Sequence, residues 1–326
     1  MIPSELGHLS NLKLLQISIN NLIGTVPLFL FNFSSIVTLA LASNQLWVDI
    51  PSDIGFKLPN LLSFHICFNK FTGALPSSLH NITKIQSIRA SNNFLTGSVP
   101  QGLESLRDLG FNLIASFGAT GQNFITSLTN STSLQLLPLQ KNLLEGVIPQ
   151  SIGNLSSSLW KLYMGNNRIY GRIPASINRL SNLQLLDLSY NSVSGEILPK
   201  ISQLQKLQML GLAENQISCE VPASLGNLTK LGPLPQDVGR LENVGTIYLS
   251  NNRLSGRIPE SNGTCKSLQN LSMANNLLSG PIPGSLRGVK GLQSLDLSLN
   301  QLSGDIPTDL QQLQTLIFLN LSFNDL

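Results

Sequence analysis

Residues 241–259 read LENVGTIYLSNNRLSGRIP, residues 265–283 read CKSLQNLSMANNLLSGPIP, and residues 289–307 read VKGLQSLDLSLNQLSGDIP. The three segments follow one frame, LxxLxxLxLxxNxLxGxIP, whose asparagine recurs every 24 residues, at Asn252, Asn276, Asn300 and Asn324. A fixed period of this length is typical of solenoid proteins, in which each repeat forms one coil and neighbouring coils cover its apolar face. The sequence therefore predicts a stack of coils.

The columns of the frame predict the structure of one coil. Leu295 and Leu297 alternate with polar residues, as in a strand with one buried face. We expect the amide of Asn300 to bond backbone groups of its own turn and of the next coil, Gly304 to permit a tight turn, and Pro307 to prevent a regular helix. The predicted asparagine ladder comprises Asn20, Asn44, Asn69, Asn93, Asn142, Asn167, Asn191, Asn215, Asn252, Asn276, Asn300 and Asn324.

These columns predict an α/β-type solenoid. Crossovers that return the chain in one direction make successive strands parallel, so we expect one long parallel sheet on the concave face and short 3-10 or irregular segments on the convex face. The frame extends over residues 1–326 as a single solenoid of about a dozen repeats of ~24 residues.

The frame is irregular at 103–131 and at 225–241. Asn215 and Asn252 are 37 residues apart, whereas two repeats would span 48, and the sequence around Leu228 and Leu231 lacks the strand pattern. We interpret this stretch as a coil without its strand, which predicts a hole in the sheet or a kink. The Gly-, Ala- and Ser-containing part of 103–131 predicts a loop on the convex side. Pro138 lies within a predicted strand and is expected to remove one ladder hydrogen bond.

Composition limits the partners of the chain. Charged residues make up 11% of the sequence, the formal net charge is +3, and no basic stripe occurs, which argues against nucleic-acid binding. No apolar run reaches the length of a membrane helix. The three cysteines, Cys67, Cys219 and Cys265, occupy repeat columns, and we interpret them as small apolar fillers without a disulfide framework.

Catalysis is not predicted. His65 and His80 are isolated in sequence, and Asp187 and Asp296 lie several coils apart, roughly 20 Å along the stack. That separation is too wide for two carboxylates that act on one bond. The sequence contains no P-loop, HExxH or nucleophile-elbow motif, so no cofactor or metal site is expected.

Both ends of the chain fall within repeats. Residues 2–7, IPSELG, match the back half of a repeat, and the last residues, NLSFNDL, stop inside another. No signal peptide is recognised after Met1. Complete solenoids protect their ends with atypical repeats, so we expect the chain to be a fragment or an incomplete gene product.

Sequons for N-glycosylation recur in one column, directly before the first leucine of a repeat. A polar, Asn-rich chain also produces N-x-[ST] by chance, and this back-segment phrase suits the turn itself. If the chain is secreted, we expect glycans at several of these positions. The candidates are Asn32, Asn81, Asn130, Asn154, Asn227 and Asn262.

The outward side chains of the predicted sheet vary, although the buried columns repeat. A row of varied polar and aromatic side chains on a rigid scaffold suits a binding surface, although a merely solvated face has the same pattern. We further expect Trp160, Tyr163 and Tyr190 to form an aromatic patch next to Asp187. The candidate ligand-binding residues are His65, Arg89, Trp160, Tyr163, Asp187, Tyr190, Tyr248 and Asp296.

The phrases LSGRIP, LSGPIP, LSGDIP, IGNLS and LDLSYN resemble the plant-specific class of leucine-rich repeat, and over nearly the whole chain they resemble ectodomains of plant leucine-rich-repeat receptor-like kinases. The run NFITSLTNSTSLQLL is similar to a cereal subfamily akin to the rice bacterial-blight resistance receptor and the flagellin and elongation-factor receptors. The resemblance implies a right-handed superhelix.

The resemblance also implies a function. It implies an extracellular sensor anchored in the plasma membrane of the parent receptor, with a peptide or protein ligand, a leucine-rich-repeat co-receptor kinase as a further partner, and a Ser/Thr kinase that signals in defence or development. Two alternatives stay open. One is a soluble inhibitor of a secreted enzyme, similar to polygalacturonase inhibitors, and the other is a decayed gene product.

Overall fold

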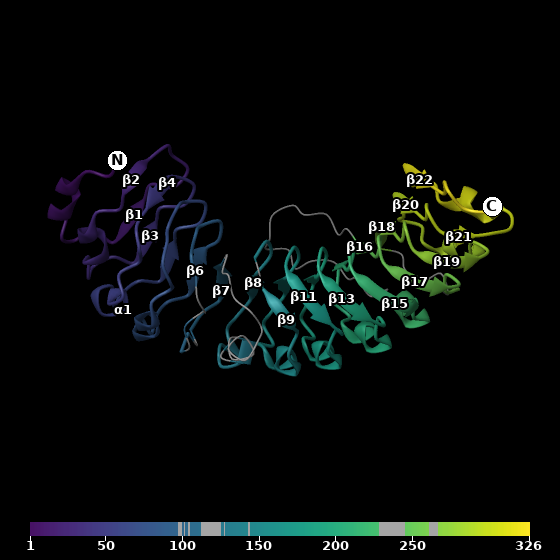
Figure 1. The fold of residues 1–326 in the computed structure, drawn as a ribbon, viewed down its shortest axis with the longest axis horizontal. Coiled ribbons are helices and arrows are strands. Elements are labelled where there is room, and N and C mark those ends of the chain that lie inside the picture. The colour runs from purple at the N-terminus through teal and green to yellow at the C-terminus, as the bar shows by residue number, and fades with distance from the viewer. Residues whose placement is uncertain are drawn as a thin grey trace. The chain divides into compact units, whose positions relative to one another are not determined.

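The computed structural model describes residues 1–96, 100, 102–103, 105–111, 125–126, 128–142, 144–227, 245–260 and 267–326. It divides into two compact units, unit 1 (Met1–Leu159) and unit 2 (Trp160–Leu326). Each unit is a stack of coils whose strands run parallel (Figure 1). The solenoid fold is confirmed within each unit, and the single solenoid over 1–326 stays a prediction.

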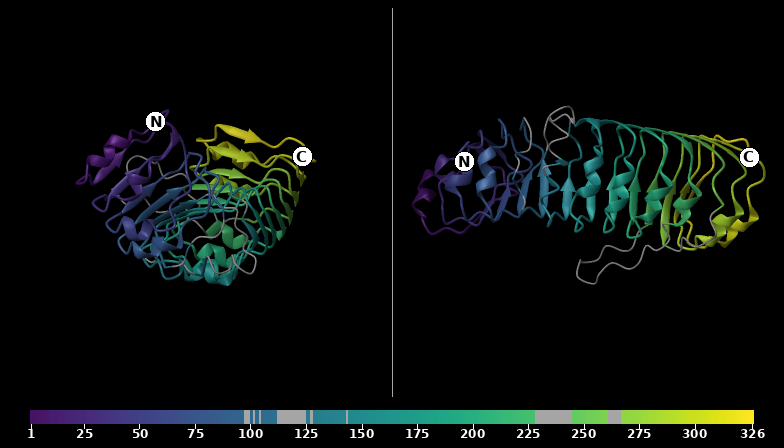
Figure 2. Two further views of the ribbon diagram at one scale, coloured as in Figure 1. Left: turned by 60° about the vertical axis from the view of Figure 1, so that its left-hand side comes forward. Right: turned by 90° about the horizontal axis from the view of Figure 1, so that it is seen from below.

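One strand per coil forms what we call the main sheet of each unit, and neighbouring coils pair in parallel within it. Figure 2 shows these strands side by side in unit 2. In unit 1 the strands are β1 (Leu14–Gln16), β3 (Thr38–Ala40), β5 (Ser63–His65), β6 (Ser87–Ala90), β7 (Asp108–Phe111) and β8 (Leu136–Pro138). In unit 2 they are β10 (Lys161–Tyr163), β12 (Leu185–Asp187), β14 (Met209–Gly211), β16 (Gly245–Tyr248), β18 (Leu268–Ser272), β20 (Ser294–Asp296) and β22 (Phe318–Asn320).

A second parallel sheet follows the main sheet in many of the coils, and the sequence analysis, which expected one sheet, missed it. The segment after the ladder asparagine is extended. In β19, for example, Leu278 is buried, and the residues on either side of it are more exposed. In unit 2 its strands are β11 (Arg168–Gly171), β13 (Ser192–Gly195), β15 (Gln216–Glu220), β17 (Arg253–Gly256), β19 (Leu277–Gly280) and β21 (Gln301–Leu302). In unit 1 β2 (Ile23–Thr25) pairs with β4 (Gln45–Trp47), and β9 is Glu145–Val147.

Short 3-10 helices close the coils, as predicted, but the proline has another role than expected. Pro307 lies directly before its helix with φ −62° and ψ 127°, and its carbonyl oxygen accepts the N–H of Leu310 at 3.1 Å. The proline therefore begins the short helix. The helices are η1 (Ser4–His8), η2 (Leu28–Phe31), η3 (Ser77–Asn81), η4 (Gln150–Asn154), η5 (Ala175–Arg179), η6 (Pro199–Gln203), η7 (Ala223–Asn227), η8 (Gly284–Gly288) and η9 (Thr308–Gln312), and one α-helical turn, α1, spans Ile54–Lys57.

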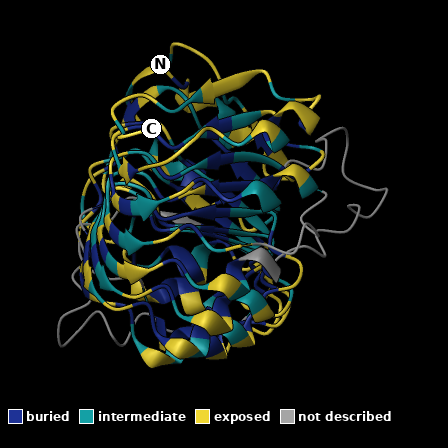
Figure 3. Cartoon of the chain, turned by 90° about the vertical axis from the view of Figure 1, so that its right-hand side faces the viewer, coloured by how far each residue is buried: buried dark blue, intermediate teal, exposed yellow. Residues whose placement is uncertain are grey.

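The core is the interior of the coils. Leu292, Leu295, Leu297 and Leu302 are 0% exposed, so all four leucine columns of that repeat face inward. Figure 3 shows buried residues inside the coils and exposed residues on the short helices and turns. Because every coil contributes the same columns, each coil's apolar face is covered by the coils before and after it.

The ladder asparagine links each coil to the coil before it, and the sequence analysis had expected the coil after it. Asn276 accepts the N–H of Leu254 at 3.0 Å and donates to Leu249 O at 3.0 Å, both in the preceding coil. It also donates to Met273 O and Ala274 O of its own turn. One buried amide thus satisfies four backbone groups that water cannot reach.

The residue before each ladder asparagine adopts a left-handed conformation. Tyr190, for example, has φ +57° and Ile19 has φ +57°, although neither is glycine. This conformation costs a non-glycine residue of the order of 1 kcal/mol, which the bonds of the neighbouring asparagine offset. The turn presents these side chains outward, and Ile19, Phe68, Tyr190, Leu299 and Phe323 are all exposed.

The stretch between Asn215 and Asn252 corrects our interpretation. β14 pairs directly with β16, with Met209 opposite Thr246 and Gly211 opposite Tyr248, so the main sheet has no hole there. Asn252 accepts the N–H of Ile217 at 3.0 Å, as a ladder asparagine does across adjacent coils. The stretch from Asn215 to Asn252 therefore accounts for one step of the stack. The sheet lacks no strand there, so this stretch no longer supports a decayed gene product. Residues 228–244, including Leu228 and Leu231, lie outside the described residues.

The expected weakness at Pro138 agrees with the pairing of β7 and β8. These strands share one aligned pair, Asp108 with Leu136, whereas β6 and β7 share four. Proline has no N–H to donate to the ladder. Most of the irregular stretch 103–131 lies outside the described residues.

Candidate functional site

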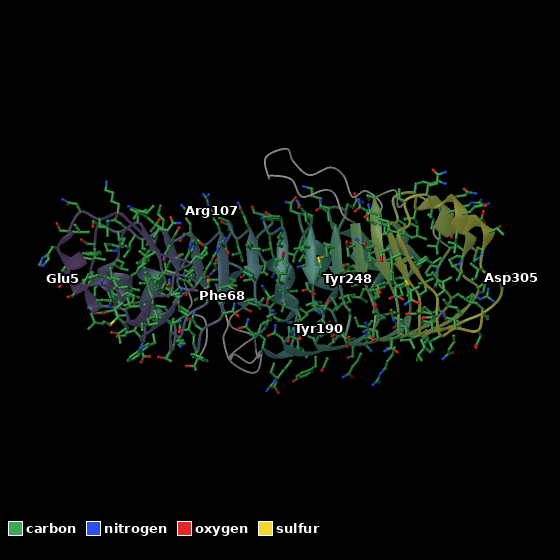
Figure 4. The ribbon with its side chains drawn as sticks, turned by 90° about the horizontal axis from the view of Figure 1, so that it is seen from above. Glu5, Phe68, Arg107, Tyr190, Tyr248 and Asp305 are labelled. Carbon is green, nitrogen blue, oxygen red and sulfur yellow. The ribbon has the colours of Figure 1, made fainter. Side chains whose placement is uncertain are left out.

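The exposed face of the main sheet in unit 2 carries a row of side chains in strict register. Tyr163 lies opposite Asp187, Asp187 opposite Gly211, and Gly211 opposite Tyr248. The row continues to Ser272, Asp296 and Asn320. Strands in a sheet are about 4.8 Å apart, so Asp187 and Asp296, four steps apart, are separated by about 19 Å. Figure 4 labels Tyr248 over these strands.

The Asp187 side chain is held by its surroundings. Its Oδ1 accepts the N–H of Ser189 at 3.0 Å. A Cβ at Gly165 would lie 2.8 Å from Oδ2, and a Cβ at Gly211 would lie 2.7 Å from Oδ1. The carboxylate therefore lies against the backbones of the two neighbouring coils, in space that only glycine leaves open. Burial and then the Asp187 charge raise the pKa of the Tyr163 hydroxyl.

The predicted aromatic patch of Trp160, Tyr163 and Tyr190 is not formed. Trp160 precedes β10 and contacts Lys161, whose ammonium lies 4.2 Å from the indole centroid. Tyr190 follows β12, and its carbonyl oxygen accepts the N–H of Asn167 in the preceding coil. Trp160 directly precedes β10, whereas Tyr190 lies three residues after the end of the adjacent strand β12, so the two residues lie at opposite ends of these parallel strands. Tyr190 appears at one edge in Figure 4.

The main sheet of unit 1 carries a polar network around His65 and Arg89. His65 Nε2 lies 2.8 Å from Ser87 Oγ, which donates to Asp108 Oδ2 at 3.3 Å. Arg89 Nε donates to the same carboxylate oxygen at 2.6 Å. Burial, and then the Arg89 charge, lower the pKa of His65, while Asp108 raises it. The other oxygen, Asp108 Oδ1, is buried without a partner.

Sequence reasoning missed Ser87 and Asp108, because Asp108 falls in the irregular stretch where the repeat frame could not be aligned. It also missed exposed apolar side chains in unit 1, namely Ile19 and Phe68 on the turns, Phe94 directly after a ladder asparagine, and Trp47 at the end of β4. Figure 4 labels Phe68 and Arg107 on this unit. The repeat frame contains no signal for these residues, since the turn accepts any side chain.

The sequons lie at the ends of the short helices. Asn32, Asn130 and Asn154 are exposed, and Asn81 is half-buried at the end of η3. Asn262 and the side chain of Asn227 lie outside the described part of the chain. Asn270 is less suited, because its amide nitrogen donates to Thr246 Oγ1 at 3.2 Å.

The cysteines differ from expectation. Cys219 is exposed and occupies the glycine column of its repeat with φ +71°, so it does not fill the core. Cys67 is half-buried, and burial raises the pKa of its thiol. Cys265 lies outside the described residues. No group of three metal-ligating side chains occurs in the described part of the chain.

An apolar cavity of about 60 Å³ lies in unit 2 and is bounded by residues that include Leu225, Ile247, Met273, Leu286 and Val289. All its lining residues are apolar, so it has no side chain that would orient a polar ligand. The repeat between the η7 and η8 repeats carries Asn262 and Cys265 at the sequence positions of Leu286 and Val289; these two residues are not described. We assign the cavity to imperfect core packing.

Comparison with known proteins identifies the repeats and the fold. The Leucine Rich Repeat family model matches residues 182–204, 243–265, 267–289 and 291–313. No curated protein matches the chain. The described residues contain no helix with the length and apolarity needed to cross a membrane.

Three similar solved structures are plant receptor ectodomains. The ectodomain of GASSHO1/SCHENGEN3 from Arabidopsis thaliana, in complex with CASPARIAN STRIP INTEGRITY FACTOR 2, is 34% identical with a TM-score of 0.77, over 99% of this chain and 40% of that one. The plant peptide hormone receptor RGFR1 with RGF2 is 30% identical with a TM-score of 0.74, over 99% and 57%.

The third is the Arabidopsis receptor kinase HAESA with the peptide hormone IDA and the co-receptor SERK1, which is 31% identical with a TM-score of 0.63, over 99% and 59%. The chain therefore spans less than two thirds of the length of each of these three proteins. It is built of leucine-rich repeats, and its structure is similar to the leucine-rich-repeat ectodomains of plant receptor kinases.

Proposed function

We propose that the chain is the ligand-recognition part of a plant cell-surface receptor-like Ser/Thr kinase and binds a peptide or protein ligand in defence or developmental signalling. The observation that supports this proposal is the row Tyr163, Asp187, Gly211 and Tyr248. Its residue types differ from coil to coil, whereas the buried columns of the repeat keep theirs. The similar ectodomains of GASSHO1/SCHENGEN3, RGFR1 and HAESA were each solved with a ligand. A rigid sheet that offers side chains at fixed spacing recognises an extended ligand without reorganisation.

The proposed role excludes catalysis. In the His65 network of the described residues, the imidazole contacts Ser87, and the Asp108 carboxylate contacts Ser87 and Arg89. A hydroxyl nucleophile needs a base whose second nitrogen is oriented by a third group, and this arrangement lacks that group. Leucine-rich-repeat ectodomains are typically binding modules, which agrees with the proposal.

The binding surface can be tested with the secreted chain immobilised and panned against a library of random 14-residue peptides. We expect selected peptides to lose at least tenfold in affinity when Tyr163, Asp187 and Tyr248 are all exchanged for alanine. The matched control exchanges Lys200 and Gln311, exposed residues near or within the short helices, and should leave affinity unchanged. Equal affinity of the triple variant and the parent would show that the row is not the binding surface.

We propose an extracellular location and a co-receptor as a further partner, because the HAESA complex contains SERK1. In solution, a SERK1-type ectodomain should co-elute with the chain only when a selected peptide is bound. Co-elution without peptide, or none with it, would argue against this partner.

Glycans are proposed at Asn32, Asn81, Asn130, Asn154, Asn227 and Asn262, since the three of these that are described as exposed are open to modifying enzymes. The chain secreted from plant cells should lose mass on treatment with an N-glycosidase. The exchange Asn32→Gln should remove one glycan, whereas Asn270→Gln, at a sequon whose amide bonds Thr246, should remove none. An unchanged mass after glycosidase treatment would rule out the glycans.

A further inference from the structure

The row on the main sheet of unit 2 carries a carboxylate between two tyrosines. Tyr163 and Asp187 lie on adjacent strands, Gly211 follows, and Tyr248 lies on the strand beyond. Gly211 has no side chain, and Asp187 Oδ1 and Ser189 Oγ lie over it, 2.7 and 2.9 Å from the position that a Cβ would take. Three strand steps place the two tyrosine backbones about 14 Å apart.

The carboxylate of Asp187 is preorganised. The Ser189 N–H fixes Asp187 Oδ1, and the glycines at 165 and 211 let both oxygens lie against the sheet. The residue is nevertheless half-exposed, so a ligand can reach it. Fixing an acceptor before binding reduces the entropy that a ligand must overcome.

The Asp187 charge has no cationic partner in the described chain. The ion pairs there join Lys57 to Asp53, Arg89 to Asp108 and Arg287 to Asp309. Lys161 is the one basic residue in the seven strands of this sheet, and its ammonium lies over the Trp160 ring. Asp187 therefore presents an uncompensated negative charge to a ligand on this face.

Asp296 provides an internal comparison. It stands in the same column and its Oδ1 accepts the Ser298 N–H at 3.1 Å, but it also accepts the Ser298 hydroxyl at 2.7 Å. Its register neighbours are Ser272 and Asn320. Asp296 thus lacks both the aromatic neighbour and the glycine neighbour, and one of its oxygens already takes two donors.

From this geometry, and resting on the proposed function, we infer that Asp187 binds one cationic group of the ligand, a lysine ammonium or an arginine guanidinium. The group lies on the exposed side of the carboxylate, donates charge-assisted hydrogen bonds to it, and lies between the rings of Tyr163 and Tyr248. Aromatic faces attract a cation and cover the apolar stem of its side chain. The ligand is therefore a peptide with a basic residue at this position.

The test uses the whole chain with ring-labelled tyrosine, since there are only four tyrosines to resolve. Acetyl-Gly-Lys-Gly-amide is titrated and the NMR signals are followed. We expect saturable shifts of Tyr163 and Tyr248, with weak affinity in the millimolar range, and no shift of Tyr170. The uncharged acetyl-Gly-Gln-Gly-amide should bind at least tenfold more weakly.

Two variants decide the assignment. Asp187→Asn keeps the size of the side chain and its acceptor for Ser189, and should weaken lysine-peptide binding at least tenfold and lower the pKa of Tyr163. Asp305→Asn, at an exposed carboxylate outside the main sheet, should change neither. Equal binding by parent and Asp187→Asn, or equal binding of the two peptides, would overturn the inference. If library peptides depend on the row but not on a basic residue, the proposed function stands and this inference fails; if no peptide binds the row, both fail.

Discussion

Exchange of Gly55 for alanine is expected to lower the free energy of unfolding by about 3 kcal/mol or more. Gly55 lies in α1, and a Cβ built on it would overlap the carbonyl group of Ser78 in η3. Ser78 contributes backbone atoms there, so no rotation of a side chain can relieve the overlap. The two coils must separate, and the buried bond from Gly55 N to Ser78 Oγ, 3.1 Å long, is lost. Urea unfolding followed by circular dichroism measures the change.

Gly284→Ala is the matched control. Gly284 also stands in a short convex helix, but its Cβ would meet only the tip of the Asp309 side chain, at 2.8 Å from Oδ2. That carboxylate can rotate away, so the expected loss is below about 1 kcal/mol. If Gly55→Ala unfolds at the same urea concentration as the parent, α1 and η3 are not in backbone contact.

The repeat columns made most of the fold predictable. The residue types of Leu295, Leu297 and Asn300 each recur at one fixed spacing. Residues that recur in this way occupy equivalent positions in successive coils. The second sheet was missed because the glycine column of the frame was expected to form a tight turn, although Gly280 in that column, with φ +77°, lies within β19. The left-handed turn at Tyr190 has no sequence signal, since the asparagine that follows it, and not the turn residue, supplies the stabilising bonds.

The candidate site was predictable only where the frame was intact. The spacing of Tyr163 and Asp187 gives their register directly. The strand that pairs with Gly211 could not be predicted, because the 37 residues from Asn215 to Asn252 are neither one period nor two. The Arg89–Asp108 pair lies at the border of an irregular stretch. The register of the strands follows from the repeat period. The contacts of long side chains across strands depend on their rotamers, which the sequence pattern does not specify.

Exchange of Asn276 for aspartate is expected to be the most destabilising single change in unit 2, by more than about 3 kcal/mol at neutral pH. The Asn276 amide nitrogen donates to the carbonyl oxygens of Leu249, Met273 and Ala274 at 3.0–3.1 Å. A carboxylate would place an oxygen against all three. The residue is only 6% exposed, so water cannot replace the lost donors. Urea unfolding at pH 7 measures the loss.

The pH dependence separates this mechanism from a simple packing defect. Burial and the facing carbonyl oxygens should raise the folded-state pKa of the introduced carboxyl above its unfolded value of about 3.9. The variant is then most stable relative to the parent below that unfolded pKa, and loses stability as the pH rises through the folded-state pKa. Asn276→Ala lacks the titrating group, so its loss of stability should not vary with pH.

Asn20→Asp is the control for position. Asn20 is exposed and its amide donates only to Ile17 O and Ser18 O of its own turn, so this exchange should cost less than about 1 kcal/mol. Equal losses at positions 20 and 276 would mean that the link to the preceding coil does not stabilise the stack.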